Sequence, residues 1–430
     1  MSYTYDGLRA DEFRLLEPIS GLHERDLCFR IRTFRREHAP PYTAVSYTWG
    51  DASASQAITI NDRDFRVRPN LWACLYYLRI YADPSVSTWK HIWVDAICIN
   101  QNDTQERSSQ VLAMRDIYMR ACTVSVWLDL IYDPKKIPWH EEVTTIDNDR
   151  WDWVEHLPDL ANKAYWTRRW VVQEFLLARQ IDYYCSGHRM DELLFRDHVG
   201  DVLGEDLHAV RLLDDSLPFN ADGHFKATAL VAARGPDAFP ELARPLQQLL
   251  VQHRQANCKE PKDRVFALLG LLPQEDRQIL SRFFPDYELS LDDVLITTLS
   301  FLRGCSNVTI TVDSHDLFEG LGVKPGYDRA RLLRYSDIWD IQNIAEHGRG
   351  ISLTSSDLDD HVRLEPSLRT SNQYPYEVCD EEFQAWMSAI ERPMMTRSTG
   401  RRVWLGRAVV LALAAGVLGG GVLWLIRALL

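Results

Sequence analysis

Residues 92–129 read IWVDAICINQNDTQERSSQVLAMRDIYMRACTVSVWLD, and this stretch predicts the fold class. It begins with an apolar run that predicts a buried strand over residues 91–97. Residues 104–121 place apolar side chains on one helical face behind a threonine that can cap the helix, and residues 123–128 form a second apolar run. A strand, a helix and another strand in succession predict a parallel sheet covered by helices on both faces.

Strands and helices also alternate on either side of this stretch. Residues 42–47 (YTAVSY) predict a strand that ends near a Gly-Asp turn. Residues 189–304 are mainly helical, and residues 305–402 have weak periodicity, which predicts a loosely ordered region and a linker. The other expected elements are a hairpin of 57–60 with 65–68, a helix that begins at Pro69, a helix over 160–179 and a strand over 181–185.

The composition bounds the class of protein. The chain has 430 residues, of which 46% are hydrophobic, and a formal net charge of −13. The apolar fraction excludes a wholly disordered chain, and the acidic balance excludes a general nucleic-acid binder, whose surface is basic. Eight cysteines without a CxxC pair predict reduced thiols. Cys185 and His188 could form half of a metal site, but the sequence offers no second half, so we expect no metal.

A long apolar stretch late in the sequence predicts a membrane helix. Residues 408–426 contain no polar side chain, and as a helix they would span about 28 Å, close to the hydrocarbon core of a bilayer. Arginines lie mainly before this stretch, which predicts a tail anchor over 403–429 with the N-terminal body in the cytosol, at the mitochondrial outer membrane or the endoplasmic reticulum. The first 13 residues lack an apolar run, so no signal peptide is expected. A stripe of small residues predicts either dimerisation in the bilayer or an anchor without a partner (Ala408, Ala412, Gly416 and Gly420).

Four stretches together resemble the fungal heterokaryon-incompatibility (HET) domain. They are YTAVSYTWGD (42–51), the stretch over 92–129, YWTRRWVVQEFLLA (165–178) and PKDRVFALLGLL (261–272). The resemblance predicts a HET domain over residues 42–188, with residues 1–41 as a lead-in segment packed on it. It implies a role in non-self recognition that leads to growth arrest or programmed cell death in filamentous fungi.

HET domains are remotely similar to Toll/interleukin-1 receptor (TIR) domains, some of which cleave NAD. The resemblance therefore implies a TIR-like parallel sheet flanked by helices. AVSYTWGD resembles the first TIR strand and its loop, which implies ligand-binding roles for the end of that strand and the loop (Tyr47, Trp49, Gly50 and Asp51). RRWVVQEFLLA resembles the TIR stretch in which a tryptophan precedes the catalytic glutamate by four residues, here Trp170 and Glu174.

The residues themselves leave the role of Glu174 open. Trp170 and Glu174 share a helical face, so an aromatic plane would lie beside a carboxylate. A fixed carboxylate can stabilise the positive charge that develops on ribose when the nicotinamide–ribose bond breaks. Glu174 could equally form an ion pair with Arg168 or Arg169, or hydrogen bond to the edge of the sheet. Trp170 could be a core residue instead of a stacking platform.

Polar residues after the strand at 91–97 are further candidates. Asp95 and Asn100 could contact a ligand, or they could fix the turn through side-chain hydrogen bonds to the backbone. Cys98 is excluded as a nucleophile, because His91 precedes the strand and leaves the thiol without a nearby base.

Three classes of mechanism follow for a membrane-tethered protein of incompatibility signalling. The first is an NAD glycohydrolase that uses Glu174 and is switched on by self-association; NAD is then the substrate, and no cofactor is firmly implied. The second is a non-enzymatic module that oligomerises and recruits protein partners in cell-death signalling. The third is toxicity caused by membrane insertion. Each of the first two requires a homo-oligomer, and none involves nucleic acid.

Overall fold

The computed structural model describes ten stretches of the chain, namely residues 3–19, 26–52, 55–81, 90–129, 159–185, 188–203, 227–234, 243–305, 310–324 and 326–338. The chain divides into two units, residues 1–341 and 342–430, and every described residue belongs to the first.

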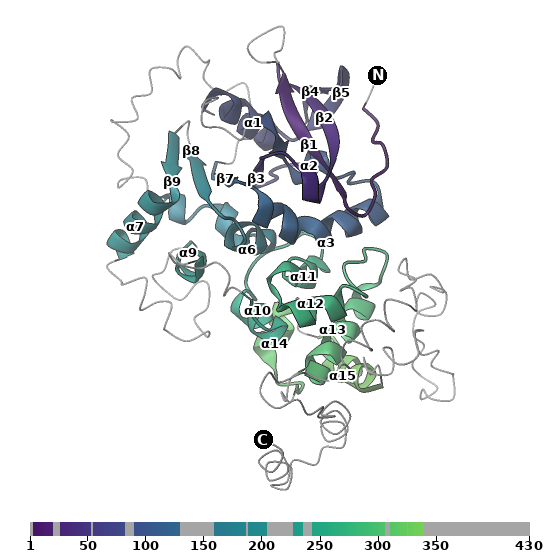
Figure 1. Cartoon of the computed structure of the whole chain (residues 1–430). Coiled ribbons are helices and arrows are strands. Elements are labelled where there is room, and N and C mark those ends of the chain that lie inside the picture. Colours follow the sequence, from purple (N-terminus) through teal and green to yellow (C-terminus); the bar gives the residue numbers. More distant parts are fainter. Residues whose placement is uncertain are drawn as a thin grey trace, which may run out of the picture. The chain divides into compact units, whose positions relative to one another are not determined.

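A nine-stranded mixed sheet forms the centre of the first unit (Figure 1). The order of its strands is β5-β4-β2-β1-β6-β3-β7-β8-β9. The neighbours β6, β3, β7 and β8 are parallel, whereas β1 pairs antiparallel with both β2 and β6. The strands are β1 (Glu12–Ile19), β2 (Cys28–Arg35), β3 (Thr43–Tyr47), β4 (Gln56–Ile60), β5 (Arg63–Val67), β6 (Ile92–Trp93), β7 (Thr123–Trp127), β8 (Ile181–Cys185) and β9 (His188–Asp191).

The prediction of a TIR-like parallel sheet is therefore wrong, because antiparallel strands extend the parallel block on both sides. On one side these are β1 and β2, which lie within the residues that the sequence analysis treats as a lead-in segment. The sequence of β2 alternates in the way that is typical of a half-buried strand: in CFRIRTFR, Phe29 and Ile31 are buried and Arg30 and Arg32 are exposed.

Helices cover both faces of the parallel block. Successive residues of a strand point to opposite faces, so Ser46 and Tyr47 of β3 face different helices. Ser46 contacts Glu174 of α6 (Arg169–Leu176), on the face that α3 (Thr104–Arg120) also covers. Trp127 is paired with Tyr47 and contacts Tyr77 of α1 (Pro69–Tyr81) on the other face.

Two predicted elements are shorter than expected. The strand expected over 91–97 ends at Trp93, and its remaining residues form the one-turn helix α2 (Asp95–Cys98). The helix expected over 160–179 is divided into a 3-10 turn (Ala164–Thr167) and α6, since Arg168 between them has extended backbone. The hairpin of β4 and β5 is confirmed, with Asn61 and Asp62 both at positive φ in its turn.

A group of helices packs below α3 and α6 in Figure 1. Arg115 of α3 donates to the carbonyl of Gly270, and Gln173 of α6 accepts from its N–H at 3.0 Å. Arg169 is fully buried and donates to the carbonyls of His253, Arg264 and Gly320, so it joins α6 to three segments of this group. The helices after β9 are α7 (Glu192–Leu203), α9 (Thr228–Arg234), α10 (Leu246–Gln252), α11 (Asp263–Phe266), α12 (Gln274–Leu280), α13 (Leu291–Cys305), α14 (His315–Gly320) and α15 (Arg329–Ile338).

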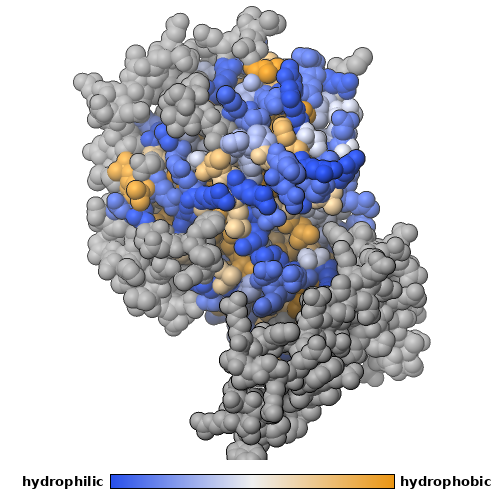
Figure 2. Space-filling model, viewed as in Figure 1, coloured by the Kyte–Doolittle hydropathy of each residue, from blue (hydrophilic) through white to orange (hydrophobic). Residues whose placement is uncertain are grey.

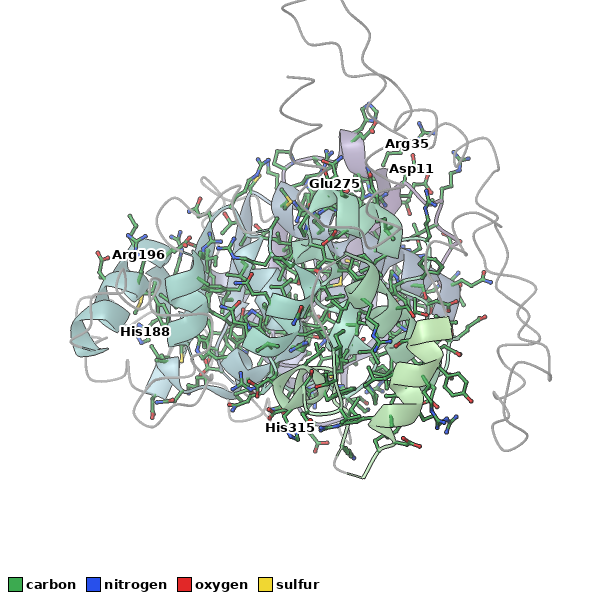
Figure 3. All side chains as sticks on the ribbon, turned by 90° about the horizontal axis from the view of Figure 1, so that it is seen from below. Asp11, Arg35, His188, Arg196, Glu275 and His315 are labelled. Carbon is green, nitrogen blue, oxygen red and sulfur yellow. The ribbon has the colours of Figure 1, made fainter. Side chains whose placement is uncertain are left out.

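The visible surface of the described residues is mainly hydrophilic, with scattered apolar side chains (Figure 2). The most exposed large apolar residue among them is Leu193 of α7, at 62%. Several charged pairs lie at the surface. Asp11 and Arg35, labelled in Figure 3, form an exposed ion pair of 3.5 Å beside the first residue of β1, and such exposed pairs contribute little to stability.

The structure corrects the prediction of a membrane helix and the localisation that depended on it. No helix in the described ranges combines the length and apolar character needed to cross a bilayer. The longest of them, α3, has 17 residues and several charged side chains, whereas a span requires about 20 apolar residues. The predicted anchor itself, residues 403–429, lies outside the described ranges.

Candidate functional site

The candidate site lies where the parallel strands end. β3 ends at Tyr47, β6 ends at Trp93 just before Asp95, and α6 crosses the adjacent face of the sheet. Open sheets of this kind bind ligands at the carboxyl ends of their parallel strands. Tyr47, Trp49, Asp95 and Glu174, all singled out from the sequence, are brought together here, and Gly50 and Asp51 belong to the same loop.

Glu174 is a buried carboxylate, and the protein holds only one of its two oxygens. Its side chain is 3% exposed. Oε2 accepts a short hydrogen bond from the hydroxyl of Ser46 and lies 3.8 Å from Nη1 of Arg168. The hydroxyl of Tyr165 is 2.8 Å from the Ser46 hydroxyl and extends the network. Oε1 has no hydrogen-bond partner among the described residues, so one carboxylate oxygen is left for another group.

Burial sets the protonation of Glu174. It raises the pKa of this carboxyl from 4.5 to about 7, even though Arg168 and the Ser46 hydroxyl lower it; the nearby charge of Asp95 raises it further. Near neutral pH both the neutral and the ionised forms are therefore populated. A buried carboxyl with a strongly shifted pKa is a common property of functional sites.

Asp95 is a second acid beside the same arginine. Its Oδ2 accepts from the Trp49 indole N–H at 2.9 Å, and its Oδ1 accepts from the backbone N–H of Ala96 at 2.7 Å. Burial raises the pKa of Asp95, while Arg168, these two hydrogen bonds and Arg68 lower it. The pair of Asp95 and Trp49 thus fixes the strand-end loop to the start of α2.

Three side chains hold the carbonyls of the Tyr47–Gly50 loop. Arg168 donates to the carbonyl of Tyr47, and Asn70 donates to that of Thr48 at 2.6 Å. Arg68 donates to the carbonyl of Gly50 at 2.9 Å. Its guanidinium carbon also lies 5.0 Å from the centre of the Trp49 ring, a distance at which a cation is attracted to the ring face.

The loop turns at Gly50, whose φ of 71° is in the left-handed region that favours glycine. Asp51 follows it and is exposed. The left-handed backbone of Gly50 thus lies where the sequence predicts a Gly-Asp turn after β3.

Trp170 lies on α6 with Glu174 but has a different partner. Its indole N–H donates to Oδ2 of Asp263 at 2.9 Å, and Tyr287 donates to Oδ1 at 2.7 Å. Burial raises the pKa of Asp263 to about 6, although both hydrogen bonds lower it. Trp170 is thus hydrogen bonded to α11, whereas Glu174 is hydrogen bonded to β3.

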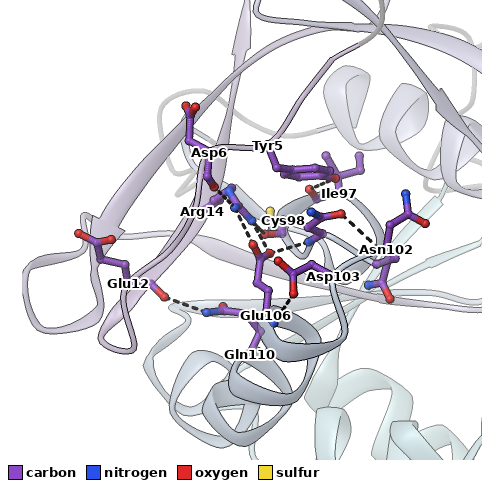
Figure 4. Close-up of polar contacts among 12 residues, drawn as sticks. Tyr5, Asp6, Glu12, Arg14, Ile97, Cys98, Asn102, Asp103, Glu106 and Gln110 are labelled. Carbon is purple, nitrogen blue, oxygen red and sulfur yellow. Dashed lines mark hydrogen bonds and ion pairs between the residues drawn. The ribbon is translucent and has the colours of Figure 1, made fainter. Parts of the chain in front are cut away.

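Asn100 belongs to a separate polar cluster around a buried ion pair. Figure 4 shows the two members of this pair, Arg14 and Glu106, at the centre of the cluster. The Asn100 backbone N–H donates to Oε1 of Glu106 at 2.6 Å. Glu106 is paired with Arg14, which also donates to the carbonyls of Asp6 and Cys98. The Asn100 side chain accepts from the backbone N–H of Asn102 at 3.2 Å. Of the two roles considered for Asn100, this bond corresponds to fixing the turn.

Four residues of the candidate site were not predicted from the sequence. Ser46 donates to Glu174 and contacts Tyr165, while Arg68 and Asn70 donate to carbonyls of the loop. A serine in the middle of the apolar run YTAVSY is a polar residue at a buried position, and that was the available signal. Arg168 was expected only as an ion-pair partner of Glu174, and this pair is confirmed.

Cys185 is the last residue of β8, and His188 is the first residue of the neighbouring strand β9. The Cys185 thiol donates to Oδ1 of Asp129 at 3.1 Å. Within the described ranges, no three or more His, Cys, Asp or Glu side chains are arranged to hold a metal ion.

Residues 42–174 match the family model of the heterokaryon incompatibility protein (HET). The curated heterokaryon incompatibility protein 6, OR allele, of Neurospora crassa is similar to this chain, with 26% identity over 359 residues. The similar region covers 67% of this chain and 51% of that protein, so the chain spans about half the length of its curated relative. No solved structure matches the chain. Residues 42–174, which include β3 and Glu174, therefore form a heterokaryon incompatibility (HET) domain.

Proposed function

We propose that this chain acts in heterokaryon incompatibility through its HET domain, together with protein partners of that signalling. The family match and the similarity to heterokaryon incompatibility protein 6 of Neurospora crassa support this role.

We further propose that Glu174 is the catalytic residue of a glycohydrolase that cleaves the nicotinamide–ribose bond of NAD. The observation that carries this proposal is that only one of the two oxygens of its carboxylate is held by the protein. Ser46 and Arg168 hold Oε2, while Oε1 has no partner among the described residues. The position at the ends of parallel strands and the pKa of about 7 also favour a functional role. The substrate class comes from the sequence resemblance.

The chemistry uses the ionised form of Glu174. When the glycosidic bond breaks, nicotinamide leaves with the bonding electron pair, and ribose acquires oxocarbenium-like positive charge. The carboxylate stabilises that charge, and Oε1 can accept a hydrogen bond from a ribose hydroxyl. Water then adds to the same carbon and loses a proton, so that NAD and water give nicotinamide, ADP-ribose and a proton. Arg168 and Ser46 would keep Glu174 in place during these steps.

A non-enzymatic oligomerising module is the second candidate. One observation favours it: the Glu174 side chain is only 3% exposed, and its contacts with Ser46 of β3 and with Arg168 join α6 to the sheet and to the segment before it. In this case the network stabilises the HET domain, and signalling depends on self-association and on the partners that it recruits.

The two candidates differ in what Glu174→Gln does. The full chain is incubated with NAD at high protein concentration, and nicotinamide release is followed by chromatography. The same variants are expressed in a filamentous fungus, where growth is scored. Glu17→Gln is a matched control, because Glu17 is a carboxylate on β1, 18% exposed and paired with Arg32.

The glycohydrolase predicts nicotinamide release by the wild type and by Glu17→Gln, and its loss in Glu174→Gln. If the wild type leaves NAD unchanged but still arrests growth, the enzymatic proposal is wrong. If Glu174→Gln folds and also arrests growth, the non-enzymatic module is supported.

A further inference from the structure

Two arginines converge on the loop at the end of β3. Arg168 reaches it from the segment before α6 and donates to the carbonyl of Tyr47. Arg68 reaches it from the residue before α1 and donates to the carbonyl of Gly50 at 2.9 Å. Both cations lower the pKa of the same two groups, Asp95 and Tyr47, which places both charges close to this loop.

Most of the hydrogen-bonding capacity of this arginine pair is unused. A guanidinium carries five N–H donors, and each of the two makes one hydrogen bond within the described part of the chain. The contact of Arg168 with Glu174, at 3.8 Å, is an ion pair but is too long for a hydrogen bond. The Arg168 side chain is 18% exposed and Arg68 is partly exposed, so solvent or a ligand can reach them.

The remaining donors are of the kind that proteins use to recognise phosphate. The planar fork of a guanidinium binds two oxygens of a phosphate at once, and it does so better than a lysine. The carbonyls of Tyr47 and Gly50 are three residues apart, which limits the distance between them to about 11 Å. Two neighbouring phosphates with their flanking sugars can bridge such a distance.

The carboxylates beside the arginine pair do not rule out an anion. Burial raises the pKa of Glu174 to about 7, so the negative charge of this carboxyl is reduced near neutral pH. Asp95 already accepts hydrogen bonds from the Trp49 indole and the Ala96 backbone N–H. The cation of Arg68 is also held against the Trp49 ring, 5.0 Å from its centre, and this contact fixes the position of its fork without neutralising it.

We propose that Arg68 and Arg168 together bind the phosphate groups of an anionic ligand at the Tyr47–Gly50 loop. The inference deepens the proposed function and rests on it for the identity of the ligand, because the diphosphate of a nicotinamide dinucleotide is such a group. Binding and cleavage remain separately measurable, since the probes of binding contain no nicotinamide–ribose bond.

The test measures binding to the full chain by isothermal titration calorimetry, with pyrophosphate, ADP and adenosine as probes. The variants are Arg68→Gln, Arg168→Gln and both together. Arg66→Gln is the matched control, because Arg66 is exposed on β5 and its loss changes the net charge equally. Circular dichroism confirms the fold of each variant, and Arg68→Lys and Arg168→Lys replace any glutamine variant that does not fold.

We expect pyrophosphate and ADP to bind the wild type and Arg66→Gln alike, and adenosine not to bind. Each single substitution at Arg68 or Arg168 should weaken binding about tenfold or more. Equal binding of both probes identifies phosphate as the whole determinant, and tighter binding of ADP identifies a nucleotide; each outcome supports the proposal. Absence of binding to the wild type, equal weakening in Arg66→Gln, or adenosine binding as tight as ADP would overturn it. If ADP binds as expected while NAD is not consumed, the glycohydrolase fails and this inference stands.

Discussion

Arg14 of β1 and Glu106 of α3 form a two-pronged buried ion pair, with Nη1–Oε1 at 2.6 Å and Nη2–Oε2 at 2.9 Å. The two residues are 92 positions apart, and the side chains of Arg14 and Glu106 are only 2% and 7% exposed. Each partner also makes hydrogen bonds to the backbone around α2. The pair therefore ties the antiparallel part of the sheet to the segment that carries Asp95.

Removal of one partner of this pair should destabilise the fold strongly. Arg14→Met leaves the Glu106 carboxylate buried without a cation, which costs about 3–5 kcal/mol of unfolding free energy. Urea unfolding measures the loss. The double variant Arg14→Met, Glu106→Met should lose less than the sum of the single variants, because it leaves no unpaired charge. The control is the partly exposed pair of Arg32 and Glu17, whose disruption should cost less than about 1 kcal/mol. Equal costs for the two pairs would contradict this account.

The proposed glycohydrolase should become more active as the pH rises through neutrality. The reaction requires the ionised form of Glu174, whose pKa burial raises to about 7. We expect kcat/KM for NAD to increase up to tenfold per pH unit below pH 7 and to level off above it. Initial rates of nicotinamide release between pH 5.5 and 8.5 test this. A rate that falls over this range would show that the neutral carboxyl is the active form.

Glu174 should also make the fold less stable at higher pH. Its pKa is raised from 4.5 to about 7, so its contribution to stability is fully present below pH 4.5 and is lost as the pH rises through 7. Glu174→Gln removes this dependence. Its free energy of unfolding relative to the wild type should therefore improve between pH 5 and pH 8, by up to about 3 kcal/mol. Chemical unfolding at both pH values measures the change, and a difference that stays constant would show that the carboxyl is ionised throughout.

The hydrogen bond from Trp170 to Asp263 should matter most when Asp263 is ionised. The indole N–H stabilises the carboxylate, whose pKa is raised to about 6 by burial. Trp170→Phe should cost about 1–3 kcal/mol of unfolding free energy at pH 8 and less at pH 5. Trp72→Phe is the control, because Trp72 stacks on Tyr76 and its loss should have the same cost at both pH values. Equal costs at both pH values for Trp170→Phe would assign the tryptophan to packing alone.

Local patterns in the sequence predicted most elements of the parallel block but not the sheet around it. β3, β7 and β8 are apolar runs of ordinary strand length, and all three are confirmed. β2 also alternates clearly, yet its place beside β1 depends on pairing over eight residue pairs with a segment earlier in the chain. Glu174 was found through a motif, whereas its contact with Ser46 joins positions 128 residues apart. The periodicity of apolar residues cannot predict such a contact, because the contact forms only when α6 packs on β3.

The HET family segment is not a self-contained piece of the structure. It covers residues 42–174, yet β1, β2, β8 and β9 of the same sheet lie outside it. A fragment cut at these boundaries would expose one edge of β6 and one edge of β7, leave Glu106 without Arg14, and remove the carbonyls to which Arg169 donates. Such a fragment would aggregate through unpaired strand edges. Transfer of the domain between proteins must therefore include residues 3–191 and the helices that enclose Arg169.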